Sequence, residues 1–241
     1  MVTTSSVLDR ARGALRSEPR IDMHRTPIGL AFDNGVMTVE GEVENVAAKK
    51  LALEHVAALP EVTGIVDRLH VKPAQAMGDG QIRDLVRDAL LEEPTRAELA
   101  IRETIKGRDE LVRQPATGAR GAITIRVNDG VVTLDGNVPS FAEKCLAGVL
   151  AWWVPGSRDV VNGLAVEPLE EDSDDEITEA VRVALEKDPF VDAGQIRVAT
   201  ANRVVTLAGL VPTDAERDMA EFDAWYVFGV DRVTNRIAVR R

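Results

Sequence analysis

The sequence of 241 residues predicts an α+β fold made of three tandem α-β-β-α-β units, each a small three-stranded mixed sheet with two helices on one face. A hairpin motif, G-V-V-T-L-x-G in its clearest form, occurs three times, at residues 35–41, 130–136 and 203–209. A short apolar strand follows each motif, with Leu69, Leu164 or Ile237 always 28 positions after the last glycine. Equal intervals between matching motifs indicate an internal repeat, because chance does not produce three of them.

The first helix of each unit is predicted from apolar residues spaced three and four apart. These residues are Val7, Leu8, Ala11, Ala14 and Leu15 in the first unit, Ile82, Leu85, Val86, Ala89 and Leu90 in the second, and Ile177, Ala180, Val181, Ala184 and Leu185 in the third. Each pattern ends at an acidic residue followed by proline: Glu18-Pro19, Glu93-Pro94 and Asp188-Pro189. Proline disfavours helical backbone in the residue before it, so all three helices should end there.

Two of the hairpins contain a dipeptide that favours a type I′ turn, Asn34-Gly35 and Asp129-Gly130. The third turns near Asn202-Arg203, a weaker signal. A second helix should follow each motif, and the last strand then closes the unit. We expect domains at residues 1–74, 82–167 and 177–241, joined by a flexible linker at 75–81, which contains Gly78 and Gly80, and an acidic linker at 168–176.

Composition limits the classes of function. The net charge of −11 argues against nucleic acid binding, which depends on Lys and Arg, and against simple electrostatic adsorption to anionic lipid. No apolar run approaches the roughly 20 residues of a transmembrane helix. The N-terminus shows no secretory signal, and Cys145 is the single cysteine, which together predict a cytoplasmic protein without an intrachain disulfide.

The order α-β-β-α-β, the hairpin motif and the V-x-N-x-[LI]-x-V pattern of the last strands together resemble the BON domain, named for bacterial OsmY and nodulation proteins. The resemblance covers approximately residues 5–71, 82–166 and 177–239. Most members of this family are non-catalytic and associated with stress, so the resemblance implies the same for this protein. Some members are periplasmic, some bind phospholipid, and one cytosolic member, which also carries a LysM domain, senses potassium. This chain shows no LysM module.

No catalytic or cofactor motif is present, so we predict that the protein is not an enzyme. Metal ligands cannot be assigned, because His24, His55 and His70 all fall in the first unit and no other unit repeats them. The acidic stretch 167–176 lacks the glycine and terminal glutamate of an EF-hand loop. It is better explained as a solvated linker that leads into a helix capped by Ser173.

The units differ most at the end of the second helix, where six of the nine aromatic residues gather in units two and three. The helical period places an apolar outer face there, whereas the first unit has Ala57 and Ala58. Two interpretations remain open: units two and three pack together through this face about a pseudo-twofold axis, or the face meets a membrane interface or a partner protein. The candidate residues are Val149, Trp152, Trp153, Phe222, Trp225, Tyr226 and Phe228.

The second unit also carries an insertion at about residues 95–121. Residues 97–106 within it are amphipathic and predict a mobile surface helix, or alternatively a lever that contacts lipid headgroups or an acidic neighbour. Taken together, the sequence predicts a non-catalytic cytoplasmic stress-associated protein that binds phospholipid or a partner protein through the aromatic helix ends. The alternative is a sensor of potassium or another cation that uses backbone carbonyls. The oligomeric state is left open.

Overall fold

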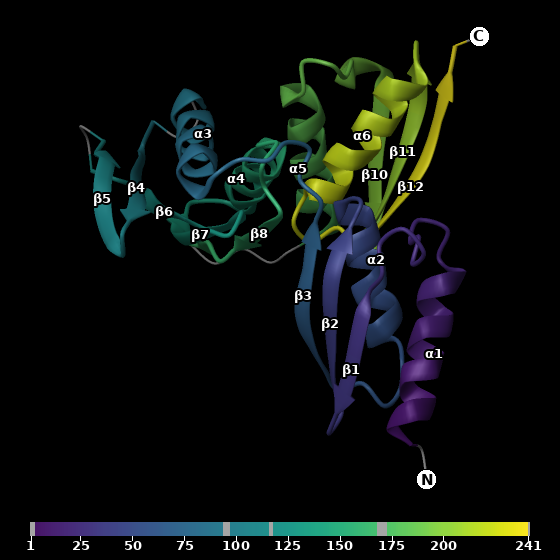
Figure 1. Cartoon of the computed structure of the whole chain (residues 1–241). Helices are drawn as coiled ribbons and strands as arrows, with labels where there is room; N and C mark the ends of the chain where they lie inside the picture. The colour runs from purple at the N-terminus through teal and green to yellow at the C-terminus, as the bar shows by residue number, and fades with distance from the viewer. Residues whose placement is uncertain (1–2, 94–96, 116–117, 168–172, 241) are drawn as a thin grey trace. The chain divides into compact units, whose positions relative to one another are not determined.

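The computed structural model describes residues 3–93, 97–115, 118–167 and 173–240. The chain divides into two compact units, Met1–Lys72 and Pro73–Arg241 (Figure 1). The first unit is domain 1. The second unit contains domain 2, which begins with α3, and domain 3, which begins with α5. All three domains have the predicted mixed α+β architecture.

Domain 1 has the predicted element order and a three-stranded sheet in which β1 pairs antiparallel with β2, and β2 pairs parallel with β3. Helices α1 and α2 contribute Val7, Leu15 and Val56 to a core that also contains Met37 and Leu69. The elements are α1 (Thr4–Ser17), β1 (Gly29–Asp33), β2 (Val36–Val43), α2 (Val46–Ala57) and β3 (Gly64–Val71).

Domain 3 repeats this topology, with strand order β10-β11-β12. A single turn of 3₁₀ helix precedes its first strand. The elements are α5 (Asp174–Lys187), η2 (Ala193–Gln195), β10 (Ile196–Ala201), β11 (Val204–Val211), α6 (Asp214–Tyr226) and β12 (Arg232–Val239). Ser173 caps α5 through a reciprocal capping box with Glu176, as the sequence predicts. Of the acidic stretch, residues 168–172 lie outside the described part of the chain.

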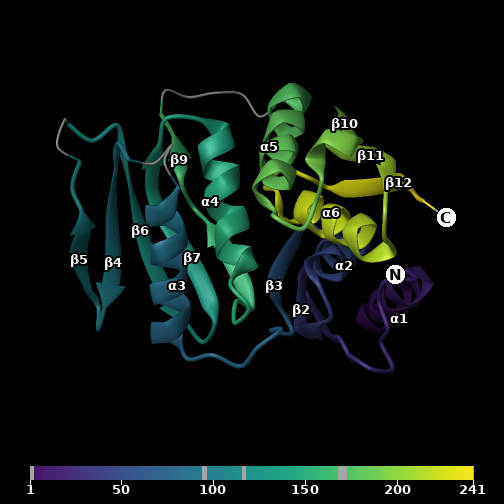
Figure 2. The same cartoon turned by 90° about the horizontal axis from the view of Figure 1, so that it is seen from above.

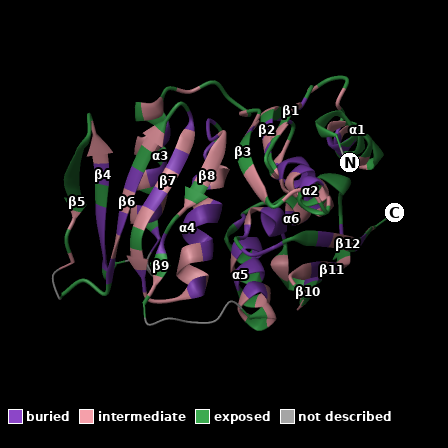
Figure 3. Ribbon diagram, turned by 90° about the horizontal axis from the view of Figure 1, so that it is seen from below, coloured by how far each residue is buried: buried purple, intermediate pink, exposed green. Residues whose placement is uncertain are grey.

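Domain 2 has the same core elements and a larger sheet, ordered β5-β4-β6-β7-β8, with β9 also paired to β7. Helices α3 and α4 lie side by side across one face of this sheet (Figure 2), and buried positions alternate along β6 and β7 (Figure 3). The elements are α3 (Asp79–Glu92), β4 (Leu99–Ile105), β5 (Arg108–Arg113), β6 (Gly121–Asn128), β7 (Val131–Val138), α4 (Phe141–Trp153), β8 (Asp159–Asn162) and β9 (Ala165–Val166).

The interval of 28 residues is the register of the parallel strand pair. Gly41 is the pairing partner of Leu69, and Gly209 is the pairing partner of Ile237. The glycine is needed because the antiparallel neighbour lies against it on the other side. A Cβ atom at Gly136 would overlap the Ala122 carbonyl oxygen, and one at Gly209 would overlap the Gln195 carbonyl oxygen. The motif therefore ends in glycine because any side chain would separate the two strands.

All three hairpins turn through two residues with positive φ, at Asn34-Gly35, Asp129-Gly130 and Asn202-Arg203, as type I′ turns require. In domains 2 and 3 the first helix holds this turn in place. The Asp79 carboxylate accepts the N–H groups of Asp129 and Gly130 at 3.0 and 2.9 Å. Asp174 does the same for the turn of domain 3, at 2.7 and 2.9 Å.

Replacing Asp174 with alanine should therefore lower the stability of unit 2 by about 1–3 kcal/mol, because two charge-assisted hydrogen bonds are lost. Urea unfolding followed by tryptophan fluorescence measures this, since all three tryptophans lie in unit 2. Asp175→Ala is the matched control, because it removes a charge from the same helical turn at an exposed side chain. Equal losses in both variants would show that the Asp174 hydrogen bonds contribute nothing beyond charge.

The asparagine of the last-strand pattern joins that strand to the second helix. Asn162 Nδ2 donates to the Lys144 carbonyl at 2.8 Å, and Asn235 Nδ2 donates to the Arg217 carbonyl at 3.1 Å. Lys144 and Arg217 both lie eight residues after the motif glycine. In domain 1 the same two positions are Lys49 and Asp67, which form a salt bridge at 3.0 Å instead.

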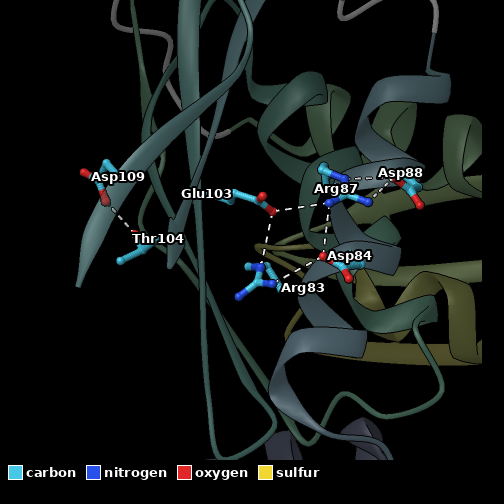
Figure 4. A network of polar contacts seen from close by, with 7 residues as sticks. All are labelled: Arg83, Asp84, Arg87, Asp88, Glu103, Thr104 and Asp109. Atoms are coloured by element: carbon cyan, nitrogen blue, oxygen red, sulfur yellow. Dashed lines mark hydrogen bonds and ion pairs between the residues drawn. The ribbon is translucent and has the colours of Figure 1, made fainter. Parts of the chain in front are cut away.

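The insertion in domain 2 is a β-hairpin, so the predicted surface helix at 97–106 is wrong. β4 pairs parallel with β6, and β5 forms the outer edge of the sheet. β4 is held to α3 by the nearly buried Glu103, whose Oε2 lies 3.3 Å from Arg83 Nε and 3.6 Å from Arg87 Nη1 (Figure 4). The two arginines supply the charge that lets an acidic residue occupy an inward strand position.

The predicted flexible linker at 75–81 is part of unit 2. The Gln75 N–H donates to the Pro155 carbonyl at 3.0 Å, and α3 already begins at Asp79. Gly78 is the N-cap of this helix. A Cβ atom at Gly156 would lie 2.7 Å from Met77 Cβ and 2.9 Å from Ile82 Cγ1. The absence of a side chain at Gly156 therefore allows Met77 and Ile82 to pack there. The stretch before α3 is therefore packed against domain 2.

Candidate functional site between domains 2 and 3

The aromatic ends of α4 and α6 meet where domain 2 packs on domain 3. The rings of Trp152 and Tyr226 stack with centroids 5.9 Å apart and planes 15° from parallel. Burial, with a contribution from the nearby Asp223, raises the pKa of Tyr226 to about 12, so its hydroxyl stays neutral. Helix α4 packs mainly against α5 and less against α6.

This packing is not symmetrical. A pseudo-twofold axis would require α3 to pack on α6 as α4 packs on α5, and the described residues of α3 and α6 form no comparable contact. The predicted pseudo-twofold arrangement is therefore wrong. The single helix α4 of domain 2 packs against both helices of domain 3, α5 and α6.

A buried polar contact lies beside the stacked rings. The Trp153 indole donates from Nε1 to Asp223 Oδ1 at 3.0 Å, and Asp223 is only 2% exposed. Its other oxygen, Oδ2, is buried and receives no hydrogen bond from the described residues. Burial, reinforced by the charge of Asp188 and a hydrogen bond to it, raises the pKa of Asp223 from 3.8 to about 8, against the opposing effect of the Trp153 hydrogen bond.

Three further contacts connect the domains. The Phe228 ring lies 6.3 Å from that of Phe141 and beneath Lys144, whose Nζ is 4.4 Å from the ring centroid. The buried Cys145 thiol lies 3.7 Å from the Phe228 carbonyl oxygen. Glu93, at the end of α3, forms a salt bridge with Lys187 at 2.9 Å, and Glu93 is nearly buried.

The seven residues predicted from the sequence divide into three groups. Val149 and Trp225 are fully buried, the latter 1% exposed with Nε1 3.4 Å from Glu221 Oε1. Trp152, Trp153 and Tyr226 are half-buried in the contacts described above. Phe222 and Phe228 remain 36% and 39% exposed. No sequence pattern indicated Phe190, which is 72% exposed and is the most exposed large apolar residue among those described.

Comparison with protein families identifies the repeated module. The BON domain model matches three segments, residues 9–73, 101–168 and 173–241, which together make up most of the chain. The chain belongs to the BON family. In domain 2 the match begins inside β4 and omits α3, because the inserted hairpin separates α3 from the rest of the domain.

Among characterised BON relatives, Osmotically-inducible protein Y of Escherichia coli strain K12 is 28% identical over 160 residues, which cover 66% of this chain and 71% of that protein. Two solved structures of CdsD, a structural protein of the type III secretion system of Chlamydia trachomatis, were also found. The first is 14% identical with a TM-score of 0.26, covering 100% of both chains. The second is 16% identical with a TM-score of 0.25, covering 97% of this chain and 92% of that one. These scores are too low to support an inference.

The three BON domains have different residues at one pair of facing positions. The acidic residue that ends the first helix is Glu18, Glu93 or Asp188, and the facing position, 14 residues after the motif glycine, is His55, Leu150 or Asp223. In domain 1 His55 Nε2 lies 3.3 Å from Glu18 Oε2. In domain 3 two carboxyl groups occupy these positions. The sequence carried this signal, but only an alignment of the copies at this position would have found it.

Within the described ranges, no three or more His, Cys, Asp or Glu side chains gather in a group that could hold a metal ion. The BON family is not a known family of enzymes. A potassium site built from backbone carbonyls is not tested by this geometry and stays a prediction. None of the described helices has the length and apolar character needed to cross a membrane.

Proposed function

We propose that this BON protein is a non-catalytic, cytoplasmic, stress-associated binding protein that engages a phospholipid surface or a partner protein through the exposed part of its aromatic helix ends. Its similarity to a protein named for osmotic induction supports the association with stress. Its single cysteine, Cys145, is buried and cannot form an intrachain disulfide, which suits a reducing compartment.

The observation that carries the proposal is the exposure of Phe190 and Phe222 on domain 3. The Phe190 N–H donates to Asp188 Oδ1 at 2.8 Å, and Asp188 contacts Asp223, the chain neighbour of Phe222. Each phenylalanine is thus within two residues of a member of one contacting pair, Asp188 and Asp223. Exposed large aromatic side chains are enriched in binding surfaces.

Liposome flotation of the full chain tests the phospholipid branch, with vesicles of phosphatidylcholine alone and of phosphatidylcholine with phosphatidylglycerol. We expect the wild type to float and Phe190→Ser/Phe222→Ser to remain at the bottom, because two exposed rings are lost. Trp152, Trp153 and Phe228 are left unchanged, since they also hold the domains together. Because the net charge is −11, neutral vesicles should bind at least as well as anionic ones.

The matched control is Leu111→Ser/Val112→Ser, which removes two exposed apolar side chains from β5 in the same unit. This variant should float like the wild type. A wild type that never floats would remove the phospholipid branch. The partner branch would then require that a protein copurifies with the wild type and not with Phe190→Ser/Phe222→Ser. Failure of both assays would refute the proposed surface.

A further inference from the structure

The Asp188 and Asp223 carboxyl groups form a buried acidic pair at the contact between domains 2 and 3. Asp188 is at the end of α5, Asp223 is on α6, and both are at least nine-tenths buried. The indole of Trp153, from α4 of domain 2, donates to the same carboxyl group. The pair is therefore part of the contact between the domains as well as of the interior of domain 3.

Among the described residues, no cation neutralises this pair. Lys187, the neighbour of Asp188, is directed to Glu93 at the end of α3. From α4 the contact to Asp223 is the uncharged Trp153 indole. On α6 itself Tyr226 is close enough for Asp223 to raise its pKa, Glu221 is bonded to Trp225 and Asn235, and Glu216 accepts the Asp192 N–H. The C-terminal end of α5 adds a partial negative charge beside Asp188. Two buried carboxylates in such surroundings cannot both be ionised at low cost.

One bound proton resolves this conflict. A protonated Asp223 can donate from Oδ2 to the Asp188 carboxylate while its Oδ1 still accepts from Trp153. The Oδ2 atom, which otherwise receives no hydrogen bond from the described residues, then becomes a donor. At the same two positions domain 1 has one acid and one imidazole in place of two acids, because His55 faces Glu18.

We propose that a proton shared by Asp188 and Asp223 holds domain 3 against domain 2, so that the contact between them is a pH-dependent latch that loosens as the pH rises. In the closed state Asp223 keeps its proton, whereas in an opened state, where water replaces the Trp153 indole, its pKa is lower and it releases the proton more readily. Opening is therefore coupled to loss of a proton.

The sign follows from this linkage. The pKa of Asp223 is raised to about 8 in the closed state and is lower once water reaches the carboxyl group, so the proton stabilises the closed state most at low pH, and that stabilisation is lost as the pH rises toward 8. The equilibrium constant for opening should rise by up to about tenfold per pH unit in this window and become constant above it.

Cys145 provides a reporter that the protein already contains. Its thiol is fully buried on α4 and lies against the Phe228 carbonyl of domain 3, so a thiol reagent reaches it only when the domains separate. We compare the rate of maleimide labelling in the wild type and in Asp223→Asn, from about pH 6 to about pH 9. Because both proteins carry the same thiol, the ratio of rates cancels the titration of the thiol itself.

Asparagine mimics the protonated acid, since its amide oxygen accepts from Trp153 and its amide nitrogen can donate to Asp188. The wild-type rate divided by the Asp223→Asn rate should therefore rise at least about tenfold between pH 6 and pH 8 and then level off. Asp218→Asn removes an exposed acid from the same helix and should keep the wild-type pH dependence. A ratio that stays constant over the whole range would overturn the latch.

Two further measurements separate the latch from misfolding and from global unfolding. If Asp223→Asn does not fold, Asp188→Asn replaces it, because removal of the second carboxylate should also flatten the pH dependence. The labelling rate is compared with the rate of global unfolding measured by circular dichroism at each pH. Labelling that occurs only as fast as global unfolding would also refute the proposal, because separation of two folded domains must be faster.

Discussion

Replacing Gly136 with alanine is expected to destabilise unit 2 by about 3 kcal/mol or more, enough to leave much of the protein unfolded. The backbone at Gly136 has a φ of +126°, which residues with a side chain rarely adopt. A methyl group there would also overlap the Ala122 carbonyl oxygen in the neighbouring strand. Either the strands separate locally or the backbone changes conformation, and both disrupt the centre of the sheet.

Urea unfolding followed by tryptophan fluorescence measures this loss in unit 2 alone, because domain 1 contains no tryptophan. Gly80→Ala is the matched control, since its added methyl group would meet only the end of the Arg83 side chain at an ordinary distance of 3.8 Å. This variant should remain within about 1 kcal/mol of the wild type, because alanine favours helix. A Gly136→Ala protein as stable as Gly80→Ala would contradict the close approach of the strands.

Replacing Trp225 with alanine should cost about 3–5 kcal/mol, the usual range for removing a large buried aromatic side chain. Trp225 is the largest fully buried side chain among the described residues, and the space that it leaves can be filled only by moving helices. The loss appears as a lower urea midpoint for unit 2, read from the fluorescence of the two remaining tryptophans or from circular dichroism.

Phe222→Ala on the same helix is the control for this prediction. Phe222 is one of the exposed aromatic residues, so its removal should change stability by less than about 1 kcal/mol. The sequence places both residues in one candidate interface, whereas in the structure Trp225 is buried and Phe222 is exposed. Similar losses in the two variants would show that Phe222 is also part of the core.

The repeated topology was predictable because its determinants are local. Turn dipeptides fix the hairpins, proline ends the first helices, and the parallel register sets the interval from Gly41 to Leu69. The inward positions of the hairpins, such as Val132 and Leu134, follow the period of two. The turn and helix-end signals lie within a few residues of the feature they determine, and the longer interval is recognisable because the chain repeats it three times.

The inserted hairpin was not predictable in the same way. Ile101 and Ile105 alternate as a strand requires, and Lys106-Gly107 forms a turn with positive φ at both residues. The inward position between the isoleucines, however, is Glu103, and a charge there contradicts a buried strand face. It is tolerated because Arg83 and Arg87 reach it from α3, sixteen or more residues earlier in the chain. The periodicity of one segment contains no information about such distant partners.

The contact between domains 2 and 3 could be predicted only in part from the sequence. Helical spacing indicates that the outer face carrying Trp153 and Tyr226 is apolar, but it does not say which surface covers that face. Asp223 looked like an ordinary polar residue, because its environment depends on Trp153 and Asp188, which are far from it in sequence. Burial of a charged group is a property of the assembled domains, so it emerges only from coordinates.

The parallel register also determines where this module can accept new sequence. An extra residue inside a paired strand would shift the pairs beyond it, whereas domain 2 shows that the stretch between the first helix and the hairpin can lengthen without such a shift. Domain 2 accommodates two additional strands there at the free margin of its sheet. The matching stretch of domain 1, where residues 22–26 form a turn at the surface, is therefore a place at which a foreign epitope or recognition loop can be grafted while the original ladder stays intact.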